Sequence, residues 1–211
     1  MERLSASILG QDNKVDLVNK LIDQGIKQIH YDVMNGTFIP NKHSLPFEQI
    51  REIVSNTKKH IVDIHLMITD PDREIQKIKD FADIMTFHYE SESIDRMKKL
   101  FRNNYNLPIG IAINPKTNVE QIYEFLYEVK HVLVMSVVPG KGGQSFIPET
   151  IDKIKKLKKY ITDRKLDVKI QVDGGINNIT AQEVFKAGAD SVVSGSYLVN
   201  NLSKATIKSL K

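Results

Sequence analysis

The stretch HIVDIHLMITDPDREIQKIKDF, residues 60–81, holds one complete repeating unit of the fold. Residues 60–68 form a short, nearly continuous run of apolar and β-branched residues, which is typical of a strand buried on both faces. Residues 71–81 space their apolar side chains at helical intervals, and Asp70-Pro71 suits an N-cap followed by proline in the first turn. The stretch therefore predicts a strand followed by a helix.

The same unit recurs along the chain. Further strands are predicted at residues 4–9, 28–34, 83–89, 108–113, 131–138, 168–173 and 190–196. Helical patterns between them include residues 15–25, 46–56, 119–129 and 181–189. Thr117 and Glu120 have the spacing of a capping box at the start of one of these helices. Eight strand–helix units predict an α/β protein with a closed parallel (β/α)₈ barrel, a TIM barrel. An open doubly wound sheet is the alternative, but its G-x-G-x-x-G fingerprint is absent after the first strand.

Composition limits the classes of protein that the chain can represent. No linker or low-complexity tract divides its 211 residues, so residues 1–211 are expected to form a single barrel domain. The net charge is only +4, and the lysine-rich residues 151–161 read as the solvated face of a helix, so no nucleic-acid partner is expected. The absence of cysteine excludes disulfides and thiolate metal sites. Neither a signal-type segment nor a membrane-length apolar run is present, so we expect a cytoplasmic protein without a membrane partner.

Unusual polar side chains gather at the predicted strand ends. They are Ser7, His30, Asp32, His65, His88, Glu90 and Asp173. In a TIM barrel the carboxyl ends of the strands carry the active site. Two imidazoles and two carboxylates, from His30, Asp32, His65 and Asp173, would converge there as a site for one divalent ion: zinc, iron, manganese or cobalt. For His88, a core histidine and a site residue remain equally open.

Glycine-rich segments follow the last three predicted strands. They read VVPGKGGQSF (137–146), VDGGIN (172–177) and SGSY (194–197). Glycines permit close backbone approach, and loops at this end of a barrel commonly bind phosphate, so the three segments predict an anion site. Met34, Met67 and Met135 also lie near strand ends, either as core residues or as an apolar lining for a substrate.

Several of these motifs together resemble one enzyme family. They are SIL (7–9), HYDVMNGTFIPN (30–41), DIHLMITDP (63–71), FHYE (87–90), GIAINPKT (110–117), VMSVVPGKGGQSFI (134–147), QVDGGI (171–176) and GADSVVSGS (188–196). Between Ser7 and Ser196 the chain resembles ribulose-phosphate 3-epimerase, a family of isomerases built on the ribulose-phosphate-binding type of (β/α)₈ barrel.

The resemblance implies a function and a set of residue roles. The implied reaction is the metal-dependent interconversion of D-ribulose 5-phosphate and D-xylulose 5-phosphate through an enediolate, in the pentose phosphate pathway. His30, Asp32, His65 and Asp173 would bind the metal, with Asp32 and Asp173 as the catalytic acid/base pair. The residues expected to contact substrate are Ser7, His65, Gly140, Lys141, Gly142, Gly143, Gly174, Gly175, Gly195 and Ser196, the last two at the phosphate. A homo-oligomer that acts on a small ketose phosphate is expected.

The chain departs from the family pattern at a few positions near the predicted site. They are Asn35, Thr37, His43, Leu45, Val138 and Lys141. Because several lie in loops that could contact substrate or a neighbouring subunit, two alternatives stay open. One is 3-epimerisation of a hexulose phosphate such as D-allulose 6-phosphate, and the other is a catalytically silent paralog that binds sugar phosphates.

Overall fold

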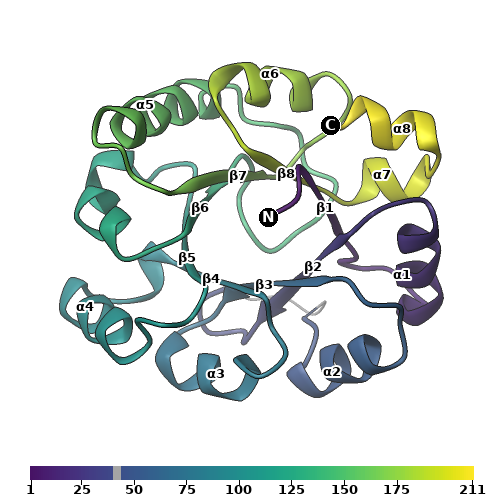
Figure 1. The fold of residues 1–211 in the computed structure, drawn as a ribbon, viewed down its shortest axis with the longest axis horizontal. Coiled ribbons are helices and arrows are strands. Elements are labelled where there is room, and N and C mark those ends of the chain that lie inside the picture. The colour runs from purple at the N-terminus through teal and green to yellow at the C-terminus, as the bar shows by residue number, and fades with distance from the viewer. Residues whose placement is uncertain (40–43) are drawn as a thin grey trace.

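The described residues form a closed barrel of eight parallel strands surrounded by helices (Figure 1). The computed structural model describes residues 1–39 and 44–211. Each strand pairs with the next in sequence, and β8 closes the barrel by pairing with β1. The predicted (β/α)₈ architecture is confirmed.

The barrel strands alternate with the helices of the outer ring. The strands are β1 (Leu4–Ser7), β2 (Gln28–Met34), β3 (Ile61–Met67), β4 (Ile84–His88), β5 (Ile109–Ile113), β6 (His131–Met135), β7 (Lys169–Asp173) and β8 (Ser191–Ser194). The α-helices are α1 (Lys14–Asp23), α2 (Phe47–Ser55), α3 (Pro71–Ile78), α4 (Ile94–Asn103), α5 (Thr150–Asp163), α6 (Thr180–Ala187), α7 (Ser196–Asn200) and α8 (Lys204–Ser209). Short 3₁₀ helices cover Tyr89–Ser91 and Val119–Tyr127.

Of the two predicted helix starts, one is confirmed and the other needs correction. Asp70 occupies the N-cap of α3 and Pro71 opens the helix, although Asp70 has left-handed backbone (φ 58°) and its side chain makes no capping hydrogen bond. The predicted capping box of Thr117 and Glu120 is displaced by one residue, because Asn118 occupies the N-cap and exchanges hydrogen bonds with Gln121. The Thr117 hydroxyl instead donates to Glu90. Sequence spacing alone does not distinguish two adjacent residues that can both cap a helix.

Side chains alternate between two environments along each strand. Outward-facing residues such as Ile29, Tyr31 and Ile64 pack against the helices in the main apolar core. Inside the barrel the apolar cluster is much smaller and includes Leu133 and Val193. The remaining inward positions are therefore available for polar groups.

Asp63 organises a polar layer inside the barrel. Its Oδ2 atom accepts hydrogen bonds from Ser5 Oγ (3.1 Å), Gln28 Nε2 (2.9 Å), Gln171 Nε2 (3.0 Å) and His30 Nδ1 (3.0 Å). A buried carboxylate is tolerated when several donors surround it. This layer fixes the His30 ring and leaves its Nε2 atom free to face the carboxyl end of the barrel.

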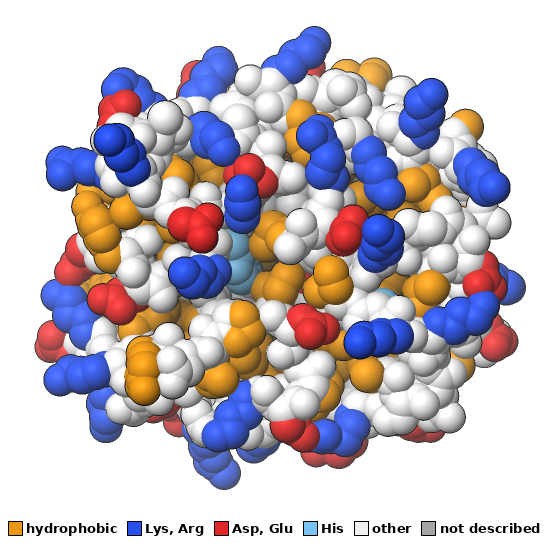
Figure 2. Space-filling model, viewed as in Figure 1, with side chains coloured by type: hydrophobic (Ala, Val, Ile, Leu, Met, Phe, Trp, Pro, Cys, Tyr) orange, Lys and Arg blue, Asp and Glu red, His pale blue; other side chains and the backbone are white. Residues whose placement is uncertain are grey.

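The surface of α5 agrees with the expectation that its lysine-rich segment is a solvated helix face. Within α5, Ile154, Leu157 and Ile161 are buried while Lys155 and Lys156 are exposed, so the lysine-rich segment is the solvated face of a helix. On the face seen in Figure 2, basic side chains are interspersed with acidic ones rather than gathered in one patch. Among the described residues, no helix has both the length and the apolar character needed to cross a membrane.

Candidate active site

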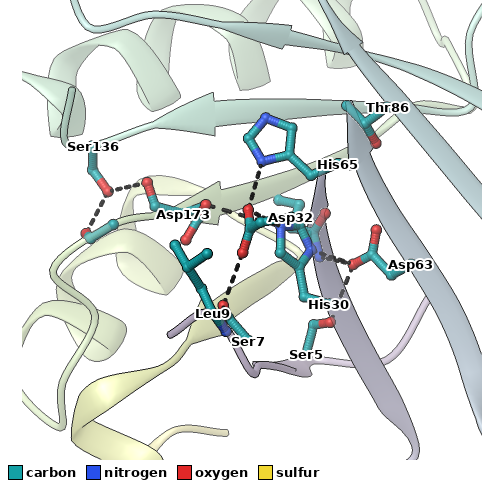
Figure 3. Close-up of polar contacts among 12 residues, drawn as sticks. Ser5, Ser7, Leu9, His30, Asp32, Asp63, His65, Thr86, Ser136 and Asp173 are labelled. Carbon is teal, nitrogen blue, oxygen red and sulfur yellow. Dashed lines mark hydrogen bonds and ion pairs between the residues drawn. The ribbon is translucent and has the colours of Figure 1, made fainter. Parts of the chain in front are cut away.

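The four predicted metal ligands meet at one point inside the barrel. His30, Asp32, His65 and Asp173 each offer one ligand atom, and these atoms all lie within 4.8 Å of one another (Figure 3). They come from β2, β3 and β7, whose carboxyl ends the parallel topology brings to the same end of the barrel. The buried His30 Nε2 atom has no hydrogen-bond partner among the described residues, while Asp32 and Asp173 oxygens lie 3.6 and 4.0 Å from it. An unpartnered imidazole nitrogen that faces two carboxylates fits a divalent cation.

Asp32 lies at the centre of this group. Its Oδ2 accepts a hydrogen bond from Ser7 Oγ at 3.0 Å, and its Oδ1 lies 3.2 Å from His65 Nδ1. Burial opposes ionisation of Asp32, but His30 and His65 outweigh burial and hold the pKa of Asp32 below its usual range. Asp32 is therefore a carboxylate at neutral pH.

Asp173 titrates in the opposite direction. Its side chain is 18% exposed, and no hydrogen bond to its carboxyl group is found in the described part of the chain. Burial raises the pKa of Asp173 to about 7, with His30 opposing the rise and the charges of Asp32 and Asp63 adding to it. The cluster thus holds one carboxyl group that is ionised and one that retains a proton until neutral pH.

The histidines of the site also differ in charge. Burial lowers the pKa of His65, and the neighbouring Asp32 only partly offsets that effect. For His30, burial is outweighed by the carboxylates of Asp63 and Asp32, which raise the pKa of His30 well above its usual value. A cation bound here would have to displace the proton on His30 Nε2, so metal binding and proton release are coupled.

All ten residues expected to contact substrate line one cavity of about 280 Å³. Asp32 and Asp173 also line it, whereas His30 is completely buried behind them. Met67 and Met135 contribute an apolar wall, and Met34 is not among the lining residues. The sequence had placed these side chains on six different strands or strand-end loops, and the barrel brings them to a single space.

Backbone geometry and close packing explain why the loop after β7 has glycine at two successive positions. Gly174 (φ 120°) and Gly175 (φ 64°) have backbone conformations that other residues rarely adopt. A Cβ atom at Gly174 would collide with the Val137 side chain, and one at Gly175 would collide with the backbone of Phe146. The loops after β6 and β7 therefore pack directly against each other at the edge of the cavity.

Most departures from the family pattern lie away from the cavity. The Asn35 side chain accepts from the Thr37 amide and donates to Thr69, so it stabilises its own turn. Leu45 is buried in the core, and His43 lies outside the described residues. Val138 lines a neighbouring hollow, and Lys141 lines both that hollow and the cavity. Of the departures that the structure describes, only Lys141 faces the space available to a substrate.

Sequence reasoning did not single out Asp63. Asp63 is completely buried, one of its oxygens accepts four hydrogen bonds, and one of these bonds holds the His30 ring. The signal was available, because Asp63 precedes His65 by two residues and so shares its inward strand face. His88, left open between two interpretations, is buried with its Nε2 atom 2.8 Å from His65 Nε2, which makes it a neighbour of the site.

Comparison with known proteins agrees with this geometry. The model of the ribulose-phosphate 3 epimerase family matches residues 3–199. The chain belongs to this family. Proteins named ribulose-phosphate 3-epimerase are 38% identical to it in Bacillus subtilis (92% of this chain, 88% of the relative) and 35% identical in Synechocystis (93% and 87%). Membership of the ribulose-phosphate 3-epimerase family confirms the expected enzyme class, an isomerase.

Solved structures with much lower sequence identity share the fold. A 3-hexulose-6-phosphate synthase superposes with a TM-score of 0.68 at 15% identity, covering 99% of this chain and 97% of that one. A phosphoribosyl anthranilate isomerase from Thermus thermophilus gives 0.67 at 14% identity, covering 99% and 96%. At such identities the likeness extends to the barrel alone.

Proposed function

We propose that this protein interconverts D-ribulose 5-phosphate and D-xylulose 5-phosphate, with one divalent metal ion bound by His30, Asp32, His65 and Asp173. The observation that carries the proposal is the joint position of two carboxylates and two imidazoles at one side of a cavity whose other walls are glycine-rich loops. Membership of the ribulose-phosphate 3-epimerase family supports the reaction type.

The proposed metal chemistry follows from the donor set. Two imidazole nitrogens and two carboxylate oxygens accept zinc, iron, manganese or cobalt. When bound, the ion acts as a Lewis acid for the negative charge that develops on the substrate oxygens next to C3. His30 has its other ring nitrogen fixed by Asp63, so its Nε2 atom already points to the metal position before any ligand arrives, and it becomes a ligand once its proton leaves.

Asp32 and Asp173 supply the proton transfers in this proposal. Epimerisation removes the proton at C3, forms an enediolate of the substrate, and returns a proton to the opposite face. That requires one group ready to accept a proton and another ready to donate one. Asp32 is held ionised and Asp173 is held protonated up to about pH 7, so the pair is divided between base and acid. The reverse reaction exchanges the two roles.

The glycine-rich loops are proposed to hold the phosphate. Gly142 lies beside Ser196, so the loops after β6 and β8 approach each other at the cavity edge, and Gly174 and Gly175 line the same cavity. Backbone N–H groups in such loops can surround an anion without a large side chain intervening. Lys141 adds a positive charge at the same edge. Binding energy from the phosphate would orient the reacting end of the sugar over the two aspartates.

Metal removal tests the proposal directly. Protein stripped with a chelator should keep its circular dichroism spectrum, because the barrel has a large core of its own, but should lose turnover of ribulose 5-phosphate in a coupled assay. Adding back zinc, iron, manganese or cobalt singly should restore it. Full activity in demonstrably metal-free protein would contradict the role of the metal.

The same assay distinguishes the alternatives. The loaded enzyme is offered ribulose 5-phosphate, xylulose 5-phosphate, allulose 6-phosphate and unphosphorylated ribulose. We expect the two pentulose phosphates to be turned over with the highest kcat/KM and ribulose to be a very poor substrate. A higher kcat/KM for allulose 6-phosphate would show that the substrate is a hexulose phosphate and not a pentulose phosphate. If the protein binds sugar phosphates but turns none of them over, it is a catalytically silent paralog.

A further inference from the structure

A second pair of polar residues, the buried His88 and the half-buried Glu90, stands behind the site, and the proposed chemistry does not use it. His88, the last residue of β4, is completely buried, and its Nε2 atom lies 2.8 Å from His65 Nε2. Its Nδ1 atom lies 3.2 Å from Glu90 Oε2. The four side chains of Asp32, His65, His88 and Glu90 therefore form one continuous chain of polar contacts that leads away from the cavity.

Glu90, at the far end of this series of contacts, has one oxygen that can only accept hydrogen bonds. Glu90 Oε1 accepts the backbone N–H of Asn114 at 2.8 Å and the Thr117 hydroxyl. The loop that supplies both donors is itself held by Lys153, whose Nζ donates to the carbonyls of Asn114 and Pro115 at 2.8 Å each. Because the Asn114 amide can only donate, Oε1 must remain an acceptor whatever the state of the rest of the chain.

Proton placement then follows along the chain. A carboxylate only accepts, so Glu90 requires a hydrogen on His88 Nδ1. A neutral imidazole has one N–H, so His88 Nε2 carries a lone pair and requires a hydrogen on His65 Nε2. His65 Nδ1 is then left as a lone pair 3.2 Å from the Asp32 carboxylate. Two acceptors that face each other at this distance repel, and a metal ion bound between them would remove that repulsion.

We propose that Glu90 is a positioning residue that acts through His88 to fix the tautomer of His65 and so presents His65 Nδ1 to the metal. The inference rests on the proposed function, in which His65 is a metal ligand. It gives the FHYE motif a role at the site although neither His88 nor Glu90 lines the cavity.

The substitution Glu90→Gln should reverse the direction of the hydrogen bonds between residue 90, His88 and His65, with almost no change in the shape of the side chain. The Asn114 amide would hold the glutamine carbonyl oxygen in the place of Oε1, which turns the glutamine NH₂ group toward His88 Nδ1. His88 would then carry its hydrogen on Nε2 and donate to His65 Nε2, leaving the hydrogen of His65 on Nδ1. Metal binding would have to displace that hydrogen, and loss of such outer partners typically lowers metal affinity about 10–100-fold.

Two measurements on the metal-free full chain test this. The first is Co²⁺ affinity, from the visible absorption of the bound ion with a competing chelator, for the wild type, Glu90→Gln and Glu149→Gln. Glu149 is a matched control, since it is an exposed acid that lines the same hollow as Glu90, and no hydrogen bond or ion pair joins it to His88 in the described part of the chain. We expect Co²⁺ affinity to fall about 10–100-fold in Glu90→Gln and to stay near the wild-type value in Glu149→Gln.

The second measurement is the ¹⁵N NMR spectrum of the histidine rings, which reports directly which nitrogen carries the hydrogen. His88 should be protonated on Nδ1 in the wild type and on Nε2 in Glu90→Gln. Equal Co²⁺ affinity in wild type and Glu90→Gln, or an equal loss in both variants, would overturn the proposal. If Glu90→Gln does not fold, a wild-type His88 protonated on Nε2 would overturn it alone. Failure of the wild type to bind Co²⁺ at all would refute the proposed metal site, while the NMR result would still decide the hydrogen-bond chain.

Discussion

Replacing Asp173 with asparagine should make the metal-free protein more stable while removing its activity. Asp173 is held in the barrel without a donor for its carboxyl group in the described structure, and burial raises its pKa from 3.8 to about 7. Above pH 7 the folded protein must carry this charge close to Asp32 and Asp63 without a metal ion to neutralise it. Asparagine has a similar shape and no charge.

The magnitude follows from the pKa difference between folded and unfolded chains. A tenfold change in proton affinity corresponds to about 1.4 kcal/mol, so a pKa raised by about three corresponds to about 4 kcal/mol. The unfolded chain loses this proton near its ordinary pKa while the folded chain keeps it, so the free energy of unfolding falls as pH rises from about 4 to about 7 and then levels. Asp173→Asn removes the fall, and its advantage over the wild type should grow over the same range. The attraction between Asp173 and His30 is already included in this pKa, so about 4 kcal/mol is the whole pH-dependent difference that the charge of Asp173 produces.

Urea unfolding of the two chelator-treated proteins, followed by circular dichroism at about pH 5 and about pH 8, measures this difference. Titrations of groups that do not interact with Asp173 are common to both proteins and cancel in the comparison. We expect the asparagine variant to gain a few kcal/mol at the higher pH and less than half as much at the lower one. With metal bound, its epimerase activity should fall about 10²–10⁴-fold. A gain that does not change with pH, or a variant less stable than the wild type at pH 8, would refute the assigned charge state of Asp173.

Two glycine substitutions test the packing around the site. Gly174→Ala places a Cβ against Val137 in a conformation with φ 120°, so it should lower kcat/KM and cost about 1–3 kcal/mol of stability. Gly36→Ala is the control: Gly36 also has positive φ but open space around it, so this variant should leave kcat/KM unchanged. Equal kinetic effects of the two would show that the contact with Val137 is unimportant. Gly110→Ala places a Cβ against the His131 ring inside the barrel, so urea unfolding should show a loss of about 1–3 kcal/mol, and an unchanged midpoint would contradict the tight packing of that layer.

The sequence predicted the barrel and the cavity because both depend on regular patterns. Each observed strand lies inside a predicted apolar run, and β2 matches residues 28–34 at both ends. Parallel strands place all carboxyl ends together, so naming the polar residue at each strand end was enough to predict that His30, Asp32, His65 and Asp173 would meet.

Contacts between distant residues could not be predicted in this way. Asp63 looks like one polar residue in an apolar strand until the register of β2 and β3 places it beside His30, and Gln171 reaches it from the far side of the barrel. Thr117 was assigned to a helix cap because its spacing to Glu120 allowed it, but its hydroxyl reaches Glu90 on another element. When a residue has two possible hydrogen-bond partners, the tertiary structure decides which one it contacts. Spacing along the sequence does not show that choice.

The three inward-facing aspartates show how the barrel gives one residue type three different states. Asp63 accepts four hydrogen bonds on a single oxygen, and these donors together with the charge on His30 overcome burial and lower its pKa. Asp32 accepts one hydrogen bond from Ser7 and faces two imidazoles, so it is ionised but still open to the cavity. The carboxyl group of Asp173 accepts no hydrogen bond in the described structure, and burial raises the pKa of Asp173 to about 7. The number of hydrogen-bond donors around each aspartate decreases from Asp63, inside the barrel, to Asp32 and Asp173 at its open end. Because its bonds are used within the barrel, Asp63 orients His30 and does not face the cavity. Of the three aspartates, only the two with few donors, Asp32 and Asp173, line the cavity, and this is why the proposed proton transfers are assigned to them.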